Sequence, residues 1–118
     1  MILIPLEPKT KKNSQQIVLK NRKPIIIQSK AYREYEEQAL WFLKPYGIDY
    51  PVNIRCLFYM KTHRRVDLTN LLEAIDDIMV KADVIKDDNY EIVAGHDGSR
   101  VYYDKENPRT EIYIEEIE

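Results

Sequence analysis

Acidic side chains are concentrated in the stretch from residue 64 to residue 93. Asp67, Glu73 and Asp77 come first, and the adjacent pair Asp87 and Asp88 follows. Carboxylates that converge without matching cations repel one another, and a hard cation removes that cost. Mg²⁺ takes oxygen ligands at about 2.0–2.1 Å, usually one or two carboxylates together with a substrate phosphate. The stretch is therefore a candidate site for a divalent metal ion.

A structural interpretation of the same residues stays open. Acidic residues opposite an apolar stripe usually form a solvated helix face. Asp67 would make a good helix cap without any chemistry, and Asp87–Asp88 could form a turn. The residue types alone do not decide between a metal site and a solvated surface.

One predicted helix positions most of these acids. Asp67 stands where an N-cap belongs, and Asn70, Glu73 and Asp77 fall on one face of the helix, a turn apart. The opposite face is apolar, because apolar residues recur there at spacings of three and four. These residues are Leu68, Leu71, Leu72, Ile75, Ile78 and Met79.

The segment after this helix is predicted to return to a sheet. A turn is expected near Ala82–Asp83, and Asp87–Asp88 are expected to open a strand that continues through Tyr90–Ala94. The segment His96–Ser99 has Asp-Gly at its centre, which is the strongest short-range hairpin signal. Arg100–Tyr103 is therefore predicted to return as the second strand of a hairpin.

The remaining elements follow from alternation, turn residues and caps. They are a short strand at Ile2–Ile4, a loose hairpin of Gln16–Leu19 and Pro24–Gln28 around Asn21-Arg22, a helix capped by Ser29 that carries residues through Leu43, and strands at Val52–Lys61 and Arg109–Ile117. This order indicates an α+β fold, with a small mixed, mainly antiparallel sheet and two helices packed on it.

Length and composition limit the class of protein. The chain has 118 residues, which suits a single domain spanning residues 1–118. Hydrophobic residues make up 44% and charged residues 32%, which is ordinary for a soluble globular protein. No apolar run approaches the roughly 20 residues that would span a bilayer, so no membrane contact and a cytoplasmic location are expected. Cys56 is the only cysteine, which excludes an internal disulfide.

Two motifs resemble the RusA family of Holliday-junction resolvases. They are Asp-Leu-x-Asn-Leu at Asp67–Leu71 and, after a helix of the expected length, Val-Ile-x-Asp-Asp at Val84–Asp88. The likeness extends upstream through Pro8, Asn13-Ser14 and Ser29–Arg33, so it covers about residues 5–115. Family members are dimeric, Mg²⁺-dependent endonucleases that cut branched DNA with clustered aspartates. The resemblance implies a homodimer, a four-way-junction substrate in recombination and repair, and Mg²⁺ as cofactor, with Mn²⁺ able to substitute.

Two positions depart from the family pattern. Its commonest form is Asp-x-Asp-Asn followed by a lysine on the next helical turn, whereas Thr69 and Glu73 stand in the second-aspartate and lysine positions here. The resemblance implies that Asp67 and Asp88 are metal ligands. It does not extend to Glu73, which is the candidate third ligand because its carboxylate could replace the lost one from one turn further along the helix. We predict Asp67, Glu73, Asp87 and Asp88 as the catalytic set, with Asn70 and Asp77 in support.

The charge distribution is consistent with a DNA substrate, although the net charge of −2 argues against one. From Lys9 to Arg33 there are eight basic residues and no acid, whereas residues 104–118 hold six acids and two bases. This asymmetry fits one phosphate-binding surface, although basic runs most often serve only solubility. The residues predicted to contact DNA are Lys11, Lys12, Lys20, Arg22, Lys23, Arg64 and Arg65.

Two alternatives from other classes stay open because of Thr69 and Glu73. One is a DNA-binding dimer that has lost cleavage and keeps structure-selective binding. The other is an acidic interaction protein whose carboxylates only solubilise a helix. Metal dependence separates the three: cutting needs Mg²⁺ or Mn²⁺, binding alone has little metal dependence, and the interaction protein does neither.

Overall fold

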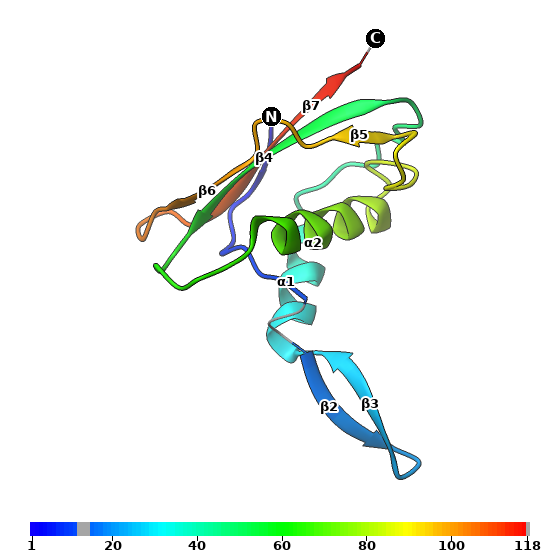
Figure 1. The fold of residues 1–118 in the computed structure, drawn as a ribbon, viewed down its shortest axis with the longest axis vertical. Helices are drawn as coiled ribbons and strands as arrows, with labels where there is room; N and C mark the ends of the chain where they lie inside the picture. The colour runs from blue at the N-terminus through cyan, green and yellow to red at the C-terminus, as the bar shows by residue number, and fades with distance from the viewer. Residues whose placement is uncertain (12–14, 118) are drawn as a thin grey trace.

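The computed structural model describes residues 1–11 and 15–117 and consists of a five-stranded sheet, two helices on one side of it and a separate hairpin (Figure 1). The strands of the sheet are β1 (Ile2–Ile4), β4 (Val52–Met60), β5 (Val93–Gly95), β6 (Arg100–Tyr103) and β7 (Arg109–Glu116); the helices are α1 (Lys30–Leu40) and α2 (Leu68–Lys81); the hairpin is β2 (Gln15–Lys20) and β3 (Lys23–Gln28). The predicted α+β class is confirmed. Within the described ranges, no helix has the length and apolarity needed to cross a membrane.

β4 is the central strand of the sheet. Val52, Ile54, Cys56 and Phe58 are buried, and the residues between them are partly exposed, which is the period-two pattern read from the sequence. One edge of β4 pairs antiparallel with β7, which pairs antiparallel with β1. The other edge pairs with β5 and β6, both parallel. The sheet is therefore mixed, as predicted.

The predicted hairpin of Tyr90–Ala94 and Arg100–Tyr103 is wrong. β5 and β6 do not pair with each other; they follow one another along the same edge of β4, with a break between them. Two side chains fill the hydrogen-bonding positions that the break leaves on β4. The Cys56 backbone N–H donates to Ser99 Oγ at 3.0 Å, and His96 Nδ1 lies 2.8 Å from the carbonyl oxygen of Ile54. Asp-Gly specifies a tight local turn, but the choice of partner strand depends on β4, far away in sequence.

The apolar stripe of α2 forms much of the core. Leu71, Ile75, Ile78 and Met79 are almost completely buried, so the predicted helix and its inward face are confirmed. The turn after the helix is also confirmed, with Asp83 at a φ of 56°. A helix with one continuous apolar stripe can bury it against a sheet while its other face stays polar, and this orientation leaves the acidic face of α2 outward.

α1 packs beside α2. Its predicted N-cap is confirmed, because Ser29 Oγ accepts a hydrogen bond from the Tyr32 backbone N–H at 3.2 Å. Tyr32, Tyr35 and Ala39 are buried on its inner face. The helix ends at Leu40, which is earlier than the sequence predicted.

The hairpin of β2 and β3 projects from the rest of the molecule as an arm (Figure 1). Asn21 and Arg22 at its tip have positive φ values of 53° and 63°, as a two-residue type I′ turn requires. Ile17 and Leu19 on the strands are 75% and 77% exposed. The predicted hairpin is confirmed, and the structure adds that it stands apart from the sheet and α2.

Candidate active site

Asp67 is the N-cap of α2, as predicted, with an extended backbone at φ −90° and ψ 129°. Its carboxylate makes no capping hydrogen bond to the helix. Among the described residues, its one hydrogen bond is a long one of 3.4 Å, accepted from the side-chain amide of Asn70, which is weak at that length. The side chain is exposed, and the positive end of the helix dipole favours an anion there. Asp67 therefore presents a largely uncommitted carboxylate at this end of α2.

The acidic face of α2 continues through Glu73 and Asp77. Glu73 is exposed. Asp77 is half-buried and ion-paired with Lys11 from the N-terminal segment. Lys11 was predicted as a DNA contact, and in the structure its ammonium group lies against α2. One cation thus neutralises part of the acidic face, close to the turn that carries Glu73.

Asp87 and Asp88 lie in the loop between α2 and β5, so the prediction that they open a strand is wrong. Asp87 Oδ1 accepts from the Asp88 backbone N–H at 2.7 Å, and Asp87 Oδ2 accepts from Asn89 Nδ2 at 3.1 Å. Asn89 Oδ1 accepts from the Glu91 backbone N–H at 2.9 Å. These local side-chain bonds compete with a strand ladder for the backbone, and the strand begins only at Val93. The Asp88 side chain is exposed.

Along the chain, α2 lies between two of the predicted metal ligands, Asp67 and Asp88. Asp67 precedes its first turn, and the loop that contains Asp88 follows its last turn (Figure 1). Among the residues that the structure describes, no three aspartate, glutamate, histidine or cysteine side chains are grouped so that they could hold a metal ion. Asp67, Glu73 and Asp88 are therefore not brought into one cluster within the chain.

Asp76 is a buried acid that the sequence analysis did not single out. Its Oδ2 lies 2.8 Å from Nε2 of His96, and the other ring nitrogen of His96 lies 2.8 Å from the carbonyl oxygen of Ile54 on β4. A carbonyl oxygen can only accept, so Nδ1 must carry a proton. Nε2 and the Asp76 carboxyl group then share one further proton between them. The pair fastens the middle of α2 to β4.

The environment raises the pKa of both members of this pair. For Asp76, burial is the main cause and the negative charge of Asp88 adds to it, while His96 acts in the opposite direction. For His96, burial lowers the pKa, but the hydrogen bond and charge of Asp76 and the Ile54 carbonyl together raise it further. Oδ1 of Asp76 is buried without a described hydrogen-bond partner. One feature of the sequence could have pointed to Asp76: it is an acid at the edge of the apolar stripe of α2, three residues before Met79.

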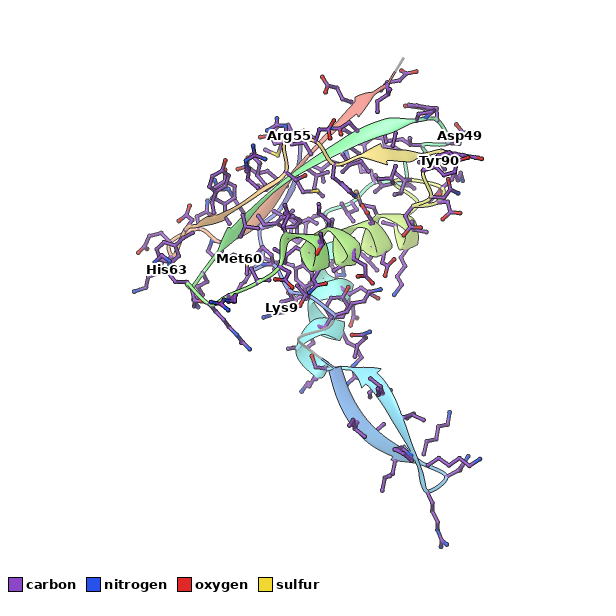
Figure 2. All side chains as sticks on the ribbon, in the orientation of Figure 1. Lys9, Asp49, Arg55, Met60, His63 and Tyr90 are labelled. Atoms are coloured by element: carbon purple, nitrogen blue, oxygen red, sulfur yellow. The ribbon has the colours of Figure 1, made fainter. Side chains whose placement is uncertain are left out.

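The basic residues predicted for DNA contact fall into separate groups. Arg64 and Arg65 are exposed just before Asp67. Lys20, Arg22 and Lys23 are exposed at the tip of the arm, and Figure 2 shows side chains with nitrogen ends extending from this tip, away from the sheet and helices. Lys12 lies outside the described residues. The structure therefore offers one basic group beside Asp67 and another on the arm.

Comparison with known proteins identifies the family. The family described as "Endodeoxyribonuclease RusA" matches residues 5–115, so the chain belongs to the RusA family. The chain is also similar to the "Crossover junction endodeoxyribonuclease RusA" of Aquifex aeolicus (strain VF5), with 34% identity over 59 residues. That alignment covers 47% of this chain and 47% of the relative, so the chain matches about half the length of this curated protein. The resemblance expected from Asp67–Leu71 and Val84–Asp88 is confirmed.

Proposed function

We propose that this chain is a metal-dependent endodeoxyribonuclease that acts as a homodimer on Holliday junctions or other branched DNA in recombination and repair. The observation that carries the proposal is the exposed carboxylate of Asp67, which makes no capping hydrogen bond and lies two residues after Arg65, in a chain of the RusA family. Phosphodiester hydrolysis needs ligands for a metal ion and cations that hold the phosphate. The name of the Aquifex relative, a crossover junction endodeoxyribonuclease, supports a crossover-junction substrate.

The donor chemistry of the acidic residues fits Mg²⁺. Asp67, Glu73 and Asp88 offer exposed carboxylate oxygens, and Mg²⁺ usually takes one or two carboxylates with waters and substrate phosphates. We assign these three residues as the ligands. When bound, Mg²⁺ or Mn²⁺ lowers the pKa of water and stabilises charge on the phosphoryl oxygens. The residues that would support the ligands from outside are Asn70, Asp77 and Asp87.

Cationic side chains would bind the phosphate and supply positive charge at the site. Hydrolysis adds water to the phosphorus and breaks one P–O ester bond, which frees a hydroxyl on one strand end. Arg64 and Arg65 would hold phosphate oxygens through their planar guanidinium groups. Lys11, paired with Asp77, places a positive charge on the acidic face of α2. This cation is our candidate for the charge missing at Glu73, where the commonest family pattern has a lysine.

The arm is the second part of the proposed DNA surface. Lys20, Arg22 and Lys23 stand at its tip, and Lys12, outside the described residues, stays part of the proposal. Their distance from α2 lets the protein hold a DNA branch that is not the one being cut. A four-way junction has near two-fold symmetry, so a two-fold dimer can place one acidic site at each of two opposed strands.

A second candidate function is structure-selective DNA binding without cleavage. Among the described residues, Asp67, Glu73 and Asp88 are not grouped so that they could hold a metal ion, which favours it. In that case the basic residues keep their role and the acids only solubilise α2. Cleavage requires that Asp88 approach Asp67, by loop movement or through the second copy of the chain.

Labelled four-way junction and duplex DNA, incubated with and without Mg²⁺ or Mn²⁺, test the proposal. We expect junction cutting only with metal, and we expect Asp67→Asn and Asp88→Asn each to abolish cutting while junction binding stays intact. Cutting is lost because each substitution removes a metal-binding charge. Junction binding survives because the same change relieves repulsion between the carboxylate and the DNA phosphates. Glu106→Gln, which neutralises an exposed acid between β6 and β7, is the matched control. Full activity of either aspartate variant would exclude the metal site, and binding without cutting by the wild type would favour the second candidate.

A further inference from the structure

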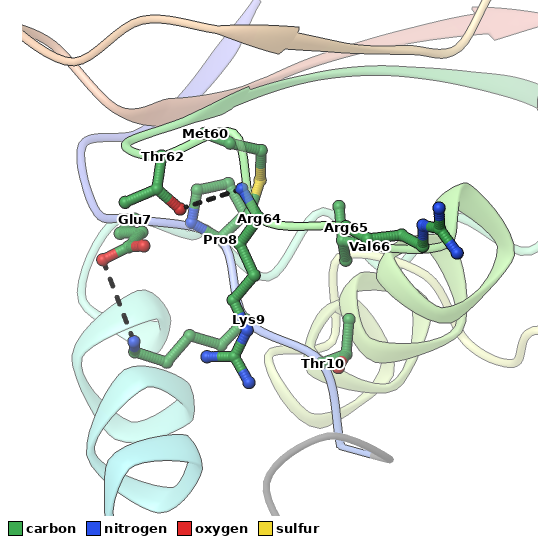
Figure 3. A pocket seen from close by; sticks show the side chains of 9 residues that line it. All are labelled: Glu7, Pro8, Lys9, Thr10, Met60, Thr62, Arg64, Arg65 and Val66. Carbon is green, nitrogen blue, oxygen red and sulfur yellow. Dashed lines mark hydrogen bonds and ion pairs between the residues drawn. The ribbon is translucent and has the colours of Figure 1, made fainter.

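A small cleft opens between the N-terminal segment 7–10 and the segment 60–66 that joins β4 to α2 (Figure 3). Its volume is about 100 Å³. Space measured in this way needs about 10–15 Å³ to hold one water, so the cleft has room for an anion the size of phosphate. Its last lining residue, Val66, directly precedes Asp67 in the sequence.

The charges around this cleft are predominantly positive. Lys9, Arg64 and Arg65 line it, and among the residues the structure describes Glu7 is the only acid that does. Figure 3 shows the Arg64 side chain extending toward Lys9, whereas Arg65 points toward α2. Lys9 Nζ lies 4.0 Å from Glu7 Oε2, which is the limit for an ion pair. Neither Arg64 nor Arg65 is ion-paired among the residues the structure describes. Two cations that face one shared space repel each other unless an anion lies between them.

The walls of the cleft are fixed by packing and by one hydrogen bond. Pro8 and Thr10, on either side of Lys9, are buried. Their burial holds the wall formed by residues 7–10 in place. Met60 contributes an apolar lining on the other side. Thr62 Oγ1 accepts a hydrogen bond from the Arg64 backbone N–H at 3.3 Å. Apolar walls beside the cations weaken screening by water and strengthen their attraction for an anion.

We propose that this cleft binds one backbone phosphate of DNA, next to the phosphate that is cut. The proposal rests on the proposed nuclease function, because it places the strand beside Asp67. Lys9 and Arg64 would take the phosphate between them, and Arg65 would contact the strand at the mouth. Arginine matches the oxygens of a phosphate in a bidentate manner. Lys9 thereby becomes a DNA-binding residue, and Glu7 becomes the residue that weakens binding.

Two measurements without metal test this cleft independently of cleavage. The first is an NMR titration with inorganic phosphate, in which the backbone amides of residues 7–10 and 60–66 should shift and those of the arm should not. The second is fluorescence anisotropy of a short labelled duplex. Lys9→Gln/Arg64→Gln should lower duplex affinity at least tenfold and reduce the salt slope by about 0.9 for the lost phosphate. Lys44→Gln/Lys105→Gln, which removes two exposed cations elsewhere, should change neither the phosphate shifts nor the salt slope.

Glu7→Gln gives a test that misfolding cannot imitate. It removes the one acid from the cleft and releases Lys9, so it should strengthen both phosphate and duplex binding severalfold. Absence of amide shifts at 7–10 and 60–66, or equal losses in the two double variants, would overturn the proposal. If phosphate and duplex bind in the cleft but no junction is cut with Mg²⁺, the cleft stands and the nuclease function fails. If junctions are cut and Lys9→Gln/Arg64→Gln binds like the wild type, the nuclease stands and the cleft fails.

Discussion

Nε2 of His96 lies 2.8 Å from Oδ2 of Asp76, and this contact joins the acidic helix to the interrupted edge of the sheet. His96 follows β5 directly, at the point where the pairing with β4 breaks, and Asp76 lies in the second half of α2. The same imidazole contacts the Ile54 carbonyl of β4. His96 therefore satisfies a carbonyl oxygen at the interrupted edge of β4 and also holds α2 against the sheet. This contact fixes the position of the acidic face of α2 relative to the loop that carries Asp88.

Stability should fall as the pH rises through the titration of this pair. The pKa values of Asp76 and His96 are both raised in the folded chain, so the folded chain holds more protons than the unfolded chain and the free energy of unfolding decreases with pH. The contribution of His96 is complete below its unfolded pKa of about 6.5 and is lost as the pH rises through the folded value. Urea unfolding at several pH values between about 5 and 9 measures this slope.

The two histidines of the chain provide a matched pair for that experiment. His96→Gln keeps an amide that can hydrogen-bond but does not titrate, so its stability curve should be flatter above about pH 6. His63→Gln replaces an exposed ring stacked on Tyr103 and should keep the wild-type slope. Parallel curves for the wild type and His96→Gln would show that the pair does not govern this pH range.

Ser99→Ala should destabilise the chain by about 1–3 kcal/mol, the cost of leaving a buried N–H without an acceptor. The N–H is that of Cys56, which donates to Ser99 Oγ at 3.0 Å across the break between β5 and β6. Urea unfolding gives the loss of stability, and hydrogen exchange should become faster at the Cys56 amide than at neighbouring amides of β4. Unchanged exchange at Cys56 would mean that another group satisfies this donor.

Local periodicity explains which parts of the fold could be predicted. β4 alternates strictly and α2 repeats its apolar residues at helical spacing, so each was identified from its own residues. The arm was identified because Asn21-Arg22 suits a two-residue turn. The partner strand of β5 and β6 could not be predicted. Both strands are short, and each pairs with β4, which is far away in the sequence.

The candidate site shows the same limit. Asp67 was placed correctly as the cap of α2 because the start of the apolar stripe defines the cap. The link between Asp76 and His96 joins residues 20 positions apart, and neither residue type signals the other. The contact of Lys11 with Asp77 likewise joins the N-terminal segment to α2. Contacts of this kind depend on packing and leave no periodic pattern in the sequence.

Charge removal at the tip of the arm should flatten the salt dependence of junction binding. Arg22→Gln/Lys23→Gln removes two exposed cations from the tip, and each lost phosphate contact lowers the log–log slope by about 0.9 on duplex DNA. Anisotropy of a labelled junction over a series of salt concentrations measures the slope, with Lys44→Gln/Lys105→Gln as the equally charged control. If both variants show the wild-type slope, the arm does not contact phosphate.

Glu73→Gln should slow Mg²⁺-dependent junction cutting at limiting metal, as the aspartate variants do. Thr69 and Glu73 are both exposed on α2 and four positions apart, which is about 6 Å along the helix axis and adjacent on its surface. Glutamate is one methylene longer than aspartate, so its carboxylate can reach toward the place where the family pattern has its second aspartate. Glu37→Gln on the exposed face of α1 is the control.

The double variant Thr69→Asp/Glu73→Lys separates a ligand role from a merely solvated one. It restores both the second aspartate and the lysine of the commonest family pattern, so it should keep or raise cutting, whereas Glu73→Gln alone lowers it. An exposed helix residue without a ligand role would change stability by less than about 0.5 kcal/mol on substitution and would leave catalysis unaltered. Wild-type rates for Glu73→Gln at limiting Mg²⁺ would therefore remove Glu73 from the ligand set and leave Asp67 and Asp88 as the two carboxylates that hold the ion.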